Sequence, residues 1–548
     1  MGPARGPGPA ARRRRRRSPG LSRRGPRRPL PWLGALIVLI VLGGVAAGAY
    51  TVHERRVANQ RQRDAAAAFA AAWTRGDTAK MWALTGGSGR PSQQAFERSY
   101  AQARKAARIA SVRVGRPGPL DHQRIRVPVT VHSTDFGTLY GYVTLRTVDQ
   151  NGTGRIHWSP EMRLPGLRKG EQVRRKAGKA PTRGEVLAAD GTPLVNDAIG
   201  AGIAGTPNGD GGPTGLERLW NSRLAGHPSE SLRYGDRVIR KVKAKHGRNV
   251  HSTIRLGLSH TAQNALGSRT GGVAVIRPKD GAVLALAGLA VSAPQPPGST
   301  FKIVTLSAAL QYHKATPASS YPVGQFAVLS GVKLHNASDE TCGGSLARSF
   351  ADSCNSVFAP LGAKVGRKRL VTMAERFGFN EQPRVPAAKV SSIAHDLRDS
   401  LAVGAAAIGQ ERDLATPLQM ASVGATIADH GVRVRPRIVR EDRVRKRRVV
   451  RSSVASTVRE FMVGVVTGGT GTAAAIPGVT VAGKTGTAEL RPTQGGPSDP
   501  QNTDAWFVCF APAYSPKVAV AVMLVGAGAG GKAAAPIARQ VLQTALKS

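Results

Sequence analysis

The sequence predicts a multi-domain chain whose last domain has an α/β fold. With 548 residues, the chain is long enough for several domains of about 100–200 residues each. Alternating apolar residues over 273–286 indicate a β-hairpin, and an Ala-rich pattern from residue 532 indicates a helix. Between them we expect a helical stretch and three further strands, at 301–430, 478–490, 504–511 and 517–525. A sheet built from both ends of a segment, with helices inserted between them, is an α/β arrangement.

A smaller α+β domain is predicted upstream of the α/β domain. The Ala-rich segment 64–73 and the segment 93–110 are typical of helices. Three alternating segments follow at 124–132, 137–147 and 154–158, and they indicate strands of a curved antiparallel sheet. The sequence shows no converging set of acidic and basic side chains there, so we interpret this domain as a spacer.

A less regular segment, 166–255, separates the two domains. It holds a Gly-rich stretch at 200–215, which indicates a loop, and a basic stretch at 233–251 without clear periodicity. We interpret 166–255 as a small, mainly-β pedestal. The expected boundaries are therefore 58–165 for the spacer, 166–255 for the pedestal and 256–548 for the α/β domain.

The N-terminal residues combine a basic run with an apolar segment. Eleven Arg and no acidic residue occur in residues 1–30, including the run Arg12–Arg17. The apolar core that follows, 33–50, is long enough to cross a hydrocarbon layer of about 30 Å. Arginines on its N-terminal side predict a single-pass transmembrane helix at 31–52, a cytoplasmic tail at 1–30 and an external remainder. A cleaved signal peptide that ends at the small residues around Ala47 is the alternative.

The net charge of +46 indicates which kinds of partner the chain could attract. Lys and Arg outnumber Asp and Glu by 79 to 33, and an excess remains when the N-terminal arginines are set aside. Outside a cell, anionic lipid headgroups and wall polymers would be attracted to such a surface in a salt-dependent way. Nucleic acid is not expected, because an Arg run directly before an apolar span is better explained as a topology signal. The basic segment 433–451 is interpreted as two strands with a solvated turn.

Three cysteines, Cys342, Cys354 and Cys509, limit the metal and disulfide chemistry of the chain. Their spacing does not match a zinc site, and neither a metal nor another cofactor is expected. In an oxidising compartment Cys342 and Cys354 could form a disulfide, and the sequence leaves this open. Cys509 lies in an expected strand and is predicted to be free and buried.

The most informative motif is the segment Ser299–Lys302. It follows a Pro-Pro-Gly sequence and opens an apolar run with helical periodicity at 303–310, so Ser299 is expected in the first turn of a buried helix. Lys302 then lies one turn away on the same helix face. Burial lowers the pKa of an amine, so a neutral Lys302 could take the proton of Ser299 and make it a nucleophile.

Two later motifs complete an acyl-transfer set. The segment Ser353–Asn355 begins 54 residues after Ser299, and the segment Lys484–Thr487 begins 131 residues after that. Alone, the first could be a helix cap or turn, and the second could be a strand that ends at a glycine. In this order, the three motifs resemble the signature of penicillin-binding proteins and serine β-lactamases.

Flanking segments narrow the resemblance to class B penicillin-binding proteins. Segments 408–410, 416–420 and 504–507 resemble a later helix of transpeptidases and the strand beside their Lys-Thr-Gly strand. Residues 182–194 resemble part of the class B linker. Residues 157–167 resemble the end of the nuclear-transport-factor-two-like domain that is best known from the methicillin-resistance type. The resemblance implies a serine β-lactamase/transpeptidase-like fold for the last domain.

The resemblance also implies a role for each motif residue. Ser299 would be the nucleophile, Lys302 the general base, and Ser353 the relay that passes the proton to the leaving amine. Asn355 would hold Lys302 and the substrate amide, and Lys484 would supply positive charge. The substrate-binding residues would be Thr485, Gly486 and Thr487, and the hydroxyls of Thr485 and Thr487 would hold the substrate carboxylate. By the same resemblance, the backbone N–H groups of Ser299 and Thr487 would form the oxyanion hole.

The implied function is a membrane-anchored D,D-transpeptidase that cross-links peptidoglycan stem peptides through an acyl-Ser299 intermediate. β-Lactams would be covalent inhibitors, and glycosyltransferase, divisome or elongasome proteins are the protein partners to consider. Three alternatives stay open: a β-lactamase-like hydrolase, a D,D-carboxypeptidase, and a non-enzymatic penicillin-sensing receptor or wall-assembly scaffold. The class B linker and the lack of a Glu-x-x-x-Asn segment favour the transpeptidase.

Overall fold

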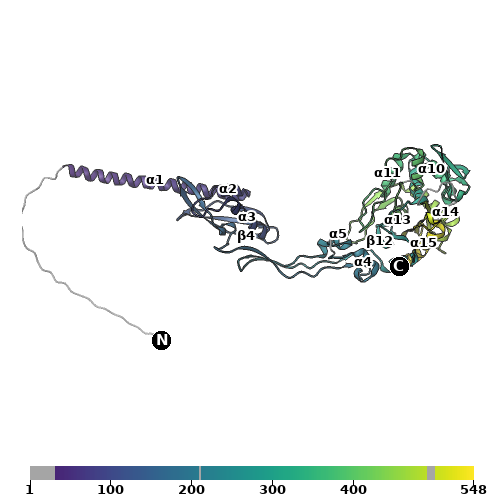
Figure 1. The fold of residues 1–548 in the computed structure, drawn as a ribbon, viewed down its shortest axis with the longest axis horizontal. Coiled ribbons are helices and arrows are strands. Elements are labelled where there is room, and N and C mark those ends of the chain that lie inside the picture. Colours follow the sequence, from purple (N-terminus) through teal and green to yellow (C-terminus); the bar gives the residue numbers. More distant parts are fainter. Residues whose placement is uncertain (1–30, 209–211, 411, 490–499, 548) are drawn as a thin grey trace, which may run out of the picture. The chain divides into compact units, whose positions relative to one another are not determined.

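The contacts within the chain divide it into two compact units (Figure 1). Unit 1 holds the residues up to Gly178 together with Glu230–Val242. Unit 2 holds Lys179–Ser229 and Lys243–Ser548. The predicted cytoplasmic tail, 1–30, lies outside the described residues. The computed structural model describes residues 31–208, 212–410, 412–489 and 500–547.

Unit 1 packs helices against one face of an antiparallel sheet. Its helices are α1 (Pro31–Arg75), α2 (Thr78–Ala83) and α3 (Gln93–Ala107). The main sheet has the order β1-β3-β4-β5, with β2 paired to β3. Its strands are β1 (Ile109–Val114), β2 (Leu120–Asp121), β3 (Arg124–Ser133), β4 (Gly137–Gln150) and β5 (Thr153–His157). A smaller sheet joins β6 (Val173–Ala177), β8 (Glu230–Tyr234) and β9 (Arg237–Val242).

Alternation of apolar and polar residues gives the main sheet one buried face. Val127, Val129 and Val131 of β3 are fully buried, and they belong to one hydrophobic cluster with Phe69 of α1 and Phe96 of α3. The residues between these valines point to the opposite face, as the period of two in a strand requires. The three strands expected from the sequence are present as β3, β4 and β5.

The helices of unit 1 differ from the expected ones in two ways. The segments expected separately at 31–52 and 64–73 are parts of the single helix α1. The helix expected over 93–110 ends at Ala107, because Arg108 has a left-handed φ of 47° and terminates it. Among the residues whose side chains the structure describes, no helix is both long and apolar enough to span a membrane, and part of the predicted anchor, including 31–38, falls outside them.

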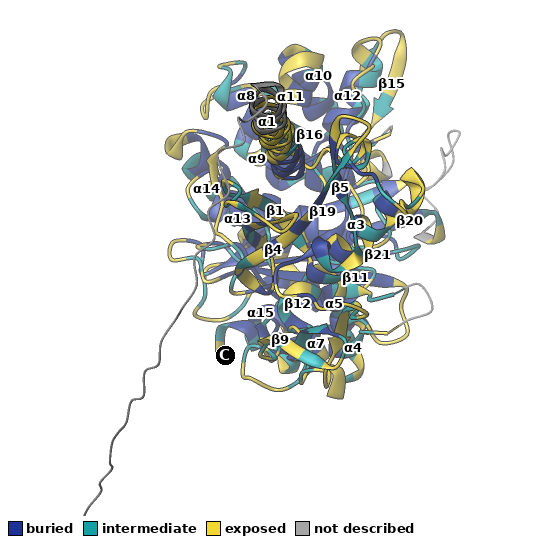
Figure 2. Ribbon diagram, turned by 90° about the vertical axis from the view of Figure 1, so that its left-hand side faces the viewer, coloured by how far each residue is buried: buried dark blue, intermediate teal, exposed yellow. Residues whose placement is uncertain are grey.

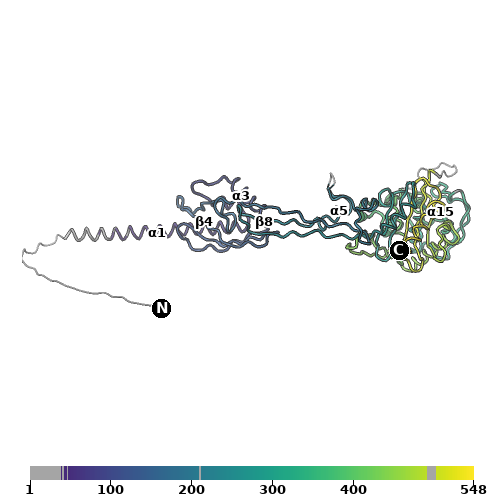
Figure 3. The backbone as a smooth tube through the Cα atoms, turned by 90° about the horizontal axis from the view of Figure 1, so that it is seen from below, coloured from purple at the N-terminus to yellow at the C-terminus, as the bar shows by residue number. Residues whose placement is uncertain are grey.

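Unit 2 is built around a five-stranded sheet with the order β12-β11-β21-β20-β19. The strands β11 and β12 form the expected hairpin, and β11 also pairs with β21, a strand near the end of the chain. Figure 3 shows that C-terminal segment, in yellow, running among teal and green segments of the same unit. The strands are β11 (Gly271–Arg277), β12 (Ala282–Gly288), β19 (Ala482–Glu489), β20 (Thr503–Ala511) and β21 (Val518–Leu524).

Helices cover both faces of this sheet, which confirms the α/β expectation. One face packs against α7 (Leu256–Leu266) and α15 (Gly530–Lys547) in a single hydrophobic cluster. The other face packs against α13 (Pro417–Ala428). A larger hydrophobic cluster on that side includes α8 (Lys302–Gln311), α9 (Leu346–Ala351), α10 (Asn355–Val365), α11 (Arg367–Phe377), α12 (Ser400–Ala407) and α14 (Ser452–Gly468).

The stretch expected to be helical over 301–430 is interrupted by four short strands. The central hairpin turns at Ser330 and Gly331, both with positive φ, which suits the twist of a two-residue β-turn. The Ser-Gly pair between alternating apolar residues is the signal that the helical prediction overlooked. The strands are β13 (Ser320–Gly324), β14 (Phe326–Leu329), β15 (Val332–His335) and β16 (Cys342–Ser345).

The segment predicted as a pedestal, 166–255, is divided between the two units. Residues 166–178 and 230–242, which hold the strands β6, β8 and β9, belong to unit 1, whereas 179–229 and 243–255 belong to unit 2. The basic stretch 233–251 contains β9 and most of the β8–β9 hairpin, which its loose patterning did not indicate. The elements in unit 2 are β7 (Val186–Leu187), α4 (Ala198–Ala204), α5 (Gly215–Leu219), α6 (Asn221–Leu224) and β10 (Val250–His251). The predicted domain boundaries stay a prediction.

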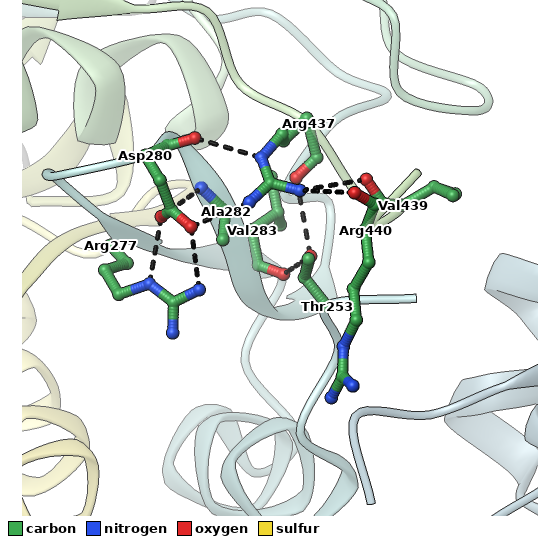
Figure 4. A network of polar contacts seen from close by, with 8 residues as sticks. All are labelled: Thr253, Arg277, Asp280, Ala282, Val283, Arg437, Val439 and Arg440. Carbon is green, nitrogen blue, oxygen red and sulfur yellow. Dashed lines mark hydrogen bonds and ion pairs between the residues drawn. The ribbon is translucent and has the colours of Figure 1, made fainter. Parts of the chain in front are cut away.

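A network of polar contacts connects Thr253, which precedes α7, and Arg437 to the β11–β12 hairpin of unit 2 (Figure 4). Thr253 donates a hydrogen bond of 2.6 Å to the carbonyl oxygen of Val283 on β12. Beside it, Asp280 in the β11–β12 turn accepts hydrogen bonds from Arg277 and, at 2.7 Å, from Arg437. Burial raises the pKa of Asp280, but these hydrogen bonds outweigh it and lower the pKa to about 2. The carboxylate is therefore charged at neutral pH and balances two guanidinium groups.

Candidate active site

The predicted nucleophile, Ser299, lies on a tight turn directly before α8. Residues Gly298–Phe301 form a 3₁₀ turn, so the serine precedes the α-helix by one turn and is half-buried. Gly298 has a left-handed φ of 52°, and a Cβ on it would lie 2.7 Å from the carbonyl oxygen of Thr487. Glycine at this position therefore lets the turn approach β19 closely. Gly298 also donates a backbone hydrogen bond of 2.9 Å to Gly409.

Lys302 is fully buried beside this serine, at the start of α8. Its Nζ lies 2.9 Å from Oγ of Ser299, 2.6 Å from Oδ1 of Asn355 and 2.6 Å from the carbonyl oxygen of Ser353. Burial lowers the pKa of Lys302 well below its ordinary value, and the nearby charge of Lys484 lowers it further. Both effects shift the amine toward its neutral form, which has a lone pair that can accept the proton of Ser299.

Lys484 is a second fully buried lysine, and it reaches the same site from β19. Its Nζ lies 2.8 Å from Oγ of Ser353, and that oxygen is 3.4 Å from Nζ of Lys302. Burial lowers the pKa of Lys484 to about 7, although the attraction of Asp352 acts in the opposite direction. The hydroxyl of Ser353 thus bridges two amines whose surroundings affect their pKa differently, which is a geometry suited to proton transfer.

Aromatic rings line the burial site of both amines. The ring of Phe358 lies 5.7 Å from Nζ of Lys302, and that of Phe350 lies 5.5 Å from Nζ of Lys484. Both rings are fully buried on the helices around the second motif. They exclude water from the amines, and the negative face of a ring partly offsets the lost hydration of a cation.

The Ser353–Asn355 corner is held in a conformation that is uncommon for non-glycine residues. Ser353 has a left-handed φ of 66°, and α10 begins two residues later at Asn355. The side-chain amide of Asn355 donates a hydrogen bond of 2.8 Å to the carbonyl oxygen of His335. This bond fixes which way the amide points, so its oxygen faces Lys302. Such backbone conformations persist where surrounding contacts determine them.

Asn336 is a buried side chain that supports this corner and that the motif pattern does not reveal. Its amide nitrogen donates hydrogen bonds to the carbonyl oxygens of Gly324 at 2.9 Å and Glu340 at 2.7 Å. Its amide oxygen accepts a hydrogen bond of 2.8 Å from the backbone N–H of Ser356, in the first turn of α10. Asn336 therefore joins the β13–β16 segment to the helix that presents Asn355.

A disulfide between Cys342 and Cys354 adds a covalent link to the same corner. The sequence left this pairing open, and the structure contains it. Because Cys354 lies between Ser353 and Asn355, the disulfide connects the motif directly to β16. Cys509 is free and buried in β20, as predicted.

Among the residues that the structure describes, the Lys-Thr-Gly strand, β19, is the outermost strand of the sheet and pairs with β20. Gly486 is enclosed, because a Cβ on it would lie 2.9 Å from atoms of Pro297, Thr300 and Trp506. Thr487 is half-buried next to the nucleophile turn. Thr485 is turned inward instead, and its hydroxyl lies 2.6 Å from that of Thr470. The geometry therefore presents Thr487, rather than Thr485, to a ligand.

The structure thus brings the predicted site residues of all three motifs into one cluster. Sequence reasoning missed Asn336, Thr470 and the carbonyl of His335, because none of them belongs to a spaced motif. In the described ranges, which leave out 1–30, 209–211, 411, 490–499 and 548, no group of three His, Cys, Asp or Glu side chains is arranged to hold a metal ion.

Comparison with known proteins agrees with this geometry. Residues 271–543 match the family model described as the penicillin binding protein transpeptidase domain. The peptidoglycan D,D-transpeptidase PbpA of Mycolicibacterium smegmatis is 33% identical over 406 residues, which are 61% of this chain and 80% of that protein. The chain belongs to the class B penicillin-binding proteins. It is a serine-type D,D-transpeptidase by family.

Two further members of the family are similar to this penicillin-binding protein. PbpA of Mycobacterium tuberculosis is 37% identical over 293 residues, which are 48% of this chain and 57% of that protein. The solved structure of penicillin-binding protein A from M. tuberculosis as its penicillin G acyl-enzyme complex has a TM-score of 0.57 at 28% identity. That likeness covers 67% of this chain and 100% of the other.

Replacing Asn336 with Ala is expected to slow acylation by penicillin about tenfold, since the loss of buried hydrogen bonds costs about 1–3 kcal/mol. The acylation rate constant should fall while the fraction of protein that finally becomes labelled stays unchanged. Asn336→Asp keeps the acceptor for Ser356 and should recover part of the rate. Asn264→Ala, at an exposed position on α7, is the matched control. A wild-type rate in a folded Asn336→Ala protein would exclude this positioning role.

Proposed function

We propose that this penicillin-binding protein cross-links peptidoglycan stem peptides through an acyl-Ser299 intermediate. The observation that supports this most directly is the fully buried Lys302, whose Nζ lies 2.9 Å from Oγ of Ser299. A neutral amine at hydrogen-bond distance from a hydroxyl is the arrangement that activates a serine nucleophile. The relatives named as peptidoglycan D,D-transpeptidases support the substrate class.

In the acylation half, Ser299 attacks the carbonyl carbon that precedes the terminal D-Ala of a stem peptide. Lys302 takes the proton of Ser299 as the new C–O bond forms. The backbone N–H groups of Ser299 and Thr487 stabilise the oxyanion, which is worth about 3–4 kcal/mol per donor in comparable sites. Ser353 relays the proton to the departing amine, the C–N bond breaks, and free D-Ala leaves.

Lys484 and Thr487 hold the terminal carboxylate during this step. The ammonium of Lys484 provides the opposite charge, and the half-buried Thr487 provides a hydroxyl. In the second half, an amine from a neighbouring strand attacks the ester, and Lys302 accepts the proton of that amine. A new amide bond forms, the ester C–O bond breaks, and Lys302 returns the proton to Oγ of Ser299, which is released. β-Lactams imitate the acyl donor, so they acylate the same serine.

Replacing Ser299 with Ala should abolish labelling by a fluorescent penicillin, because no other hydroxyl replaces the nucleophile. We expect a loss of at least about a thousandfold in the labelling rate. Ser307→Ala, on α8, is the control, because the hydroxyl of Ser307 donates a hydrogen bond to the helix backbone at Ile303 and the change should leave labelling intact. Unchanged labelling of Ser299→Ala would refute the assignment, and rapid release of the label to water would indicate a β-lactamase.

Acylation by benzylpenicillin should decline as the pH rises through about 7, because Lys484 then loses its charge. The pKa of Lys302 lies below its ordinary value, so this amine is neutral, and active as a base, on the alkaline side of that pKa. The measurement is the second-order acylation rate constant from about pH 6 to about pH 9. The methyl ester of benzylpenicillin is the control, because it has no carboxylate for Lys484 to attract. Parallel profiles for acid and ester would contradict the role of Lys484.

We further propose that residues 31–52 anchor the protein in the cell membrane, with residues 1–30 in the cytoplasm and the catalytic domain outside. Leu39, Leu42 and Val45 of α1 expose 66%, 59% and 64% of their surface, and Figure 2 draws much of α1 in the colour of exposed residues. Apolar side chains in such a helix are stable in a lipid phase. Residues 58–165 would then be a spacer of the nuclear-transport-factor-two-like type.

The anchor is tested by sedimenting membranes that contain the full chain. We expect the protein to stay with the membrane in high salt and to be released by detergent, because burial of apolar side chains does not depend on ionic strength. Release by high salt alone would show that the arginines hold the protein only at the membrane surface.

A further inference from the structure

The outward face of the main sheet in unit 1 has features of a binding surface. Along β3 and β4 the odd-numbered residues point into the core, and the even-numbered residues point away from it. The outward residues include two tyrosines and several arginines, which are side chains enriched at recognition surfaces. We call this set the Tyr–Arg face, and it consists of Arg113, Arg124, Arg126, Tyr140, Tyr142 and Arg146.

The two tyrosines expose large aromatic surfaces without a partner to cover them. Tyr140 exposes 66% of its surface and Tyr142 exposes 49%. Their ring centroids are 6.2 Å apart, and the guanidinium carbon of Arg126 lies 4.5 Å from the centroid of the Tyr142 ring. Stacking by Arg126 holds one ring in place, and a pre-ordered ring loses little conformational entropy when a ligand binds.

Two arginines of this face repel each other in the sheet when no ligand is bound. Arg124 of β3 lies directly opposite Arg146 of β4, and like charges in directly opposite positions destabilise a strand pair. None of the four arginines forms an ion pair with a residue that the structure describes. Asp121, which is opposite Arg124 on β2, contacts His122 instead at 2.6 Å. A bound anion between Arg124 and Arg146 would relieve their repulsion.

We propose that the Tyr–Arg face binds an anionic polysaccharide. Sugar rings would stack on Tyr140 and Tyr142, while carboxylates would accept hydrogen bonds from Arg124 and Arg146. Thr130 and Thr144, on the same face, have hydroxyls that could form hydrogen bonds with sugar hydroxyls. A lipid surface is less suitable, because the face lacks the Leu, Phe and Trp side chains that insert into a bilayer.

The choice of a wall glycan as the polysaccharide rests on the proposed function. A protein that joins the stem peptides of a polymer has to stay on that polymer between reactions. A weak site outside the catalytic unit would raise the effective concentration of stem peptides around the protein. The net charge of +46 adds a long-range attraction for the carboxylates of such a polymer.

The test is binding of soluble, uncross-linked peptidoglycan strands to the full chain with Ser299→Ala, so that no cross-linking contributes. The double variants Tyr140→Ala/Tyr142→Ala and Arg124→Gln/Arg146→Gln should each weaken binding about tenfold, as expected for hot-spot residues. The control, Arg98→Gln/Lys105→Gln on the exposed surface of α3, removes the same charge and should bind as the parent does. Added salt should weaken binding of the parent more than that of the arginine variant.

Competing probes identify the occupant. Poly-glutamate has carboxylates without sugar rings, and chitin oligosaccharides have sugar rings without carboxylates, so both should compete poorly. Equal competition by poly-glutamate would overturn the proposal in favour of an acidic peptide. Stronger binding to phosphatidylglycerol vesicles would overturn it in favour of a membrane. Unchanged binding in both double variants would exclude the face altogether.

Penicillin labelling separates this proposal from the proposed function. With Ser299 intact, both double variants should be labelled at the rate of the unaltered protein. Lost glycan binding with normal labelling supports the Tyr–Arg face and leaves the catalytic assignment untouched. Normal glycan binding together with labelling that persists in Ser299→Ala would instead refute the catalytic assignment alone.

Discussion

The catalytic unit depends on the burial of two lysines at one serine. Burial disfavours the charge on both amines, and each charge disfavours the other, so the two lysines cannot behave alike. Asp352 attracts Lys484 and so favours the charge there, whereas burial and the charge of Lys484 both lower the pKa of Lys302. This inequality provides one base and one cation within reach of the same hydroxyl, that of Ser353.

This electrostatic arrangement explains why the fold joins distant segments of the chain. Lys302 lies on α8 and Lys484 on β19, and most of the helices of the domain come between these two elements in the sequence. The two elements can approach only because Gly298 and Gly486 have no side chains in the way, since a Cβ on either would meet backbone oxygen within 3 Å. The α/β order, with a sheet closed by the last strands, therefore brings the base and the cation together only when the whole domain is folded.

The sequence predicted the local parts of this site better than the contacts between them. The three motifs indicated Ser299, Lys302 and Lys484 because their spacing along the chain is itself the signal. Asn336 could not be predicted, since its three hydrogen bonds join backbone groups that come together only in the folded unit. The inward position of Thr485 was missed for a related reason. Its partner, Thr470, comes from the segment that follows α14, and no local pattern links the two residues.

Positive charges on the outer surface of the protein act differently from those buried in the site. Inside, burial lowers the pKa of Lys302 and the nearby charge of Lys484 lowers it further, and dissolved salt has little access to either effect. On the sheet of unit 1, the same sign of charge is exposed, so its attraction for anions is weak at each arginine and is reduced by salt. Positive charge therefore has two roles in this protein. Buried charge adjusts the chemistry at Ser299, and exposed charge keeps an anionic polymer close. The two effects should therefore differ in their response to ionic strength, with polymer binding sensitive to it and the basicity of Lys302 nearly independent of it.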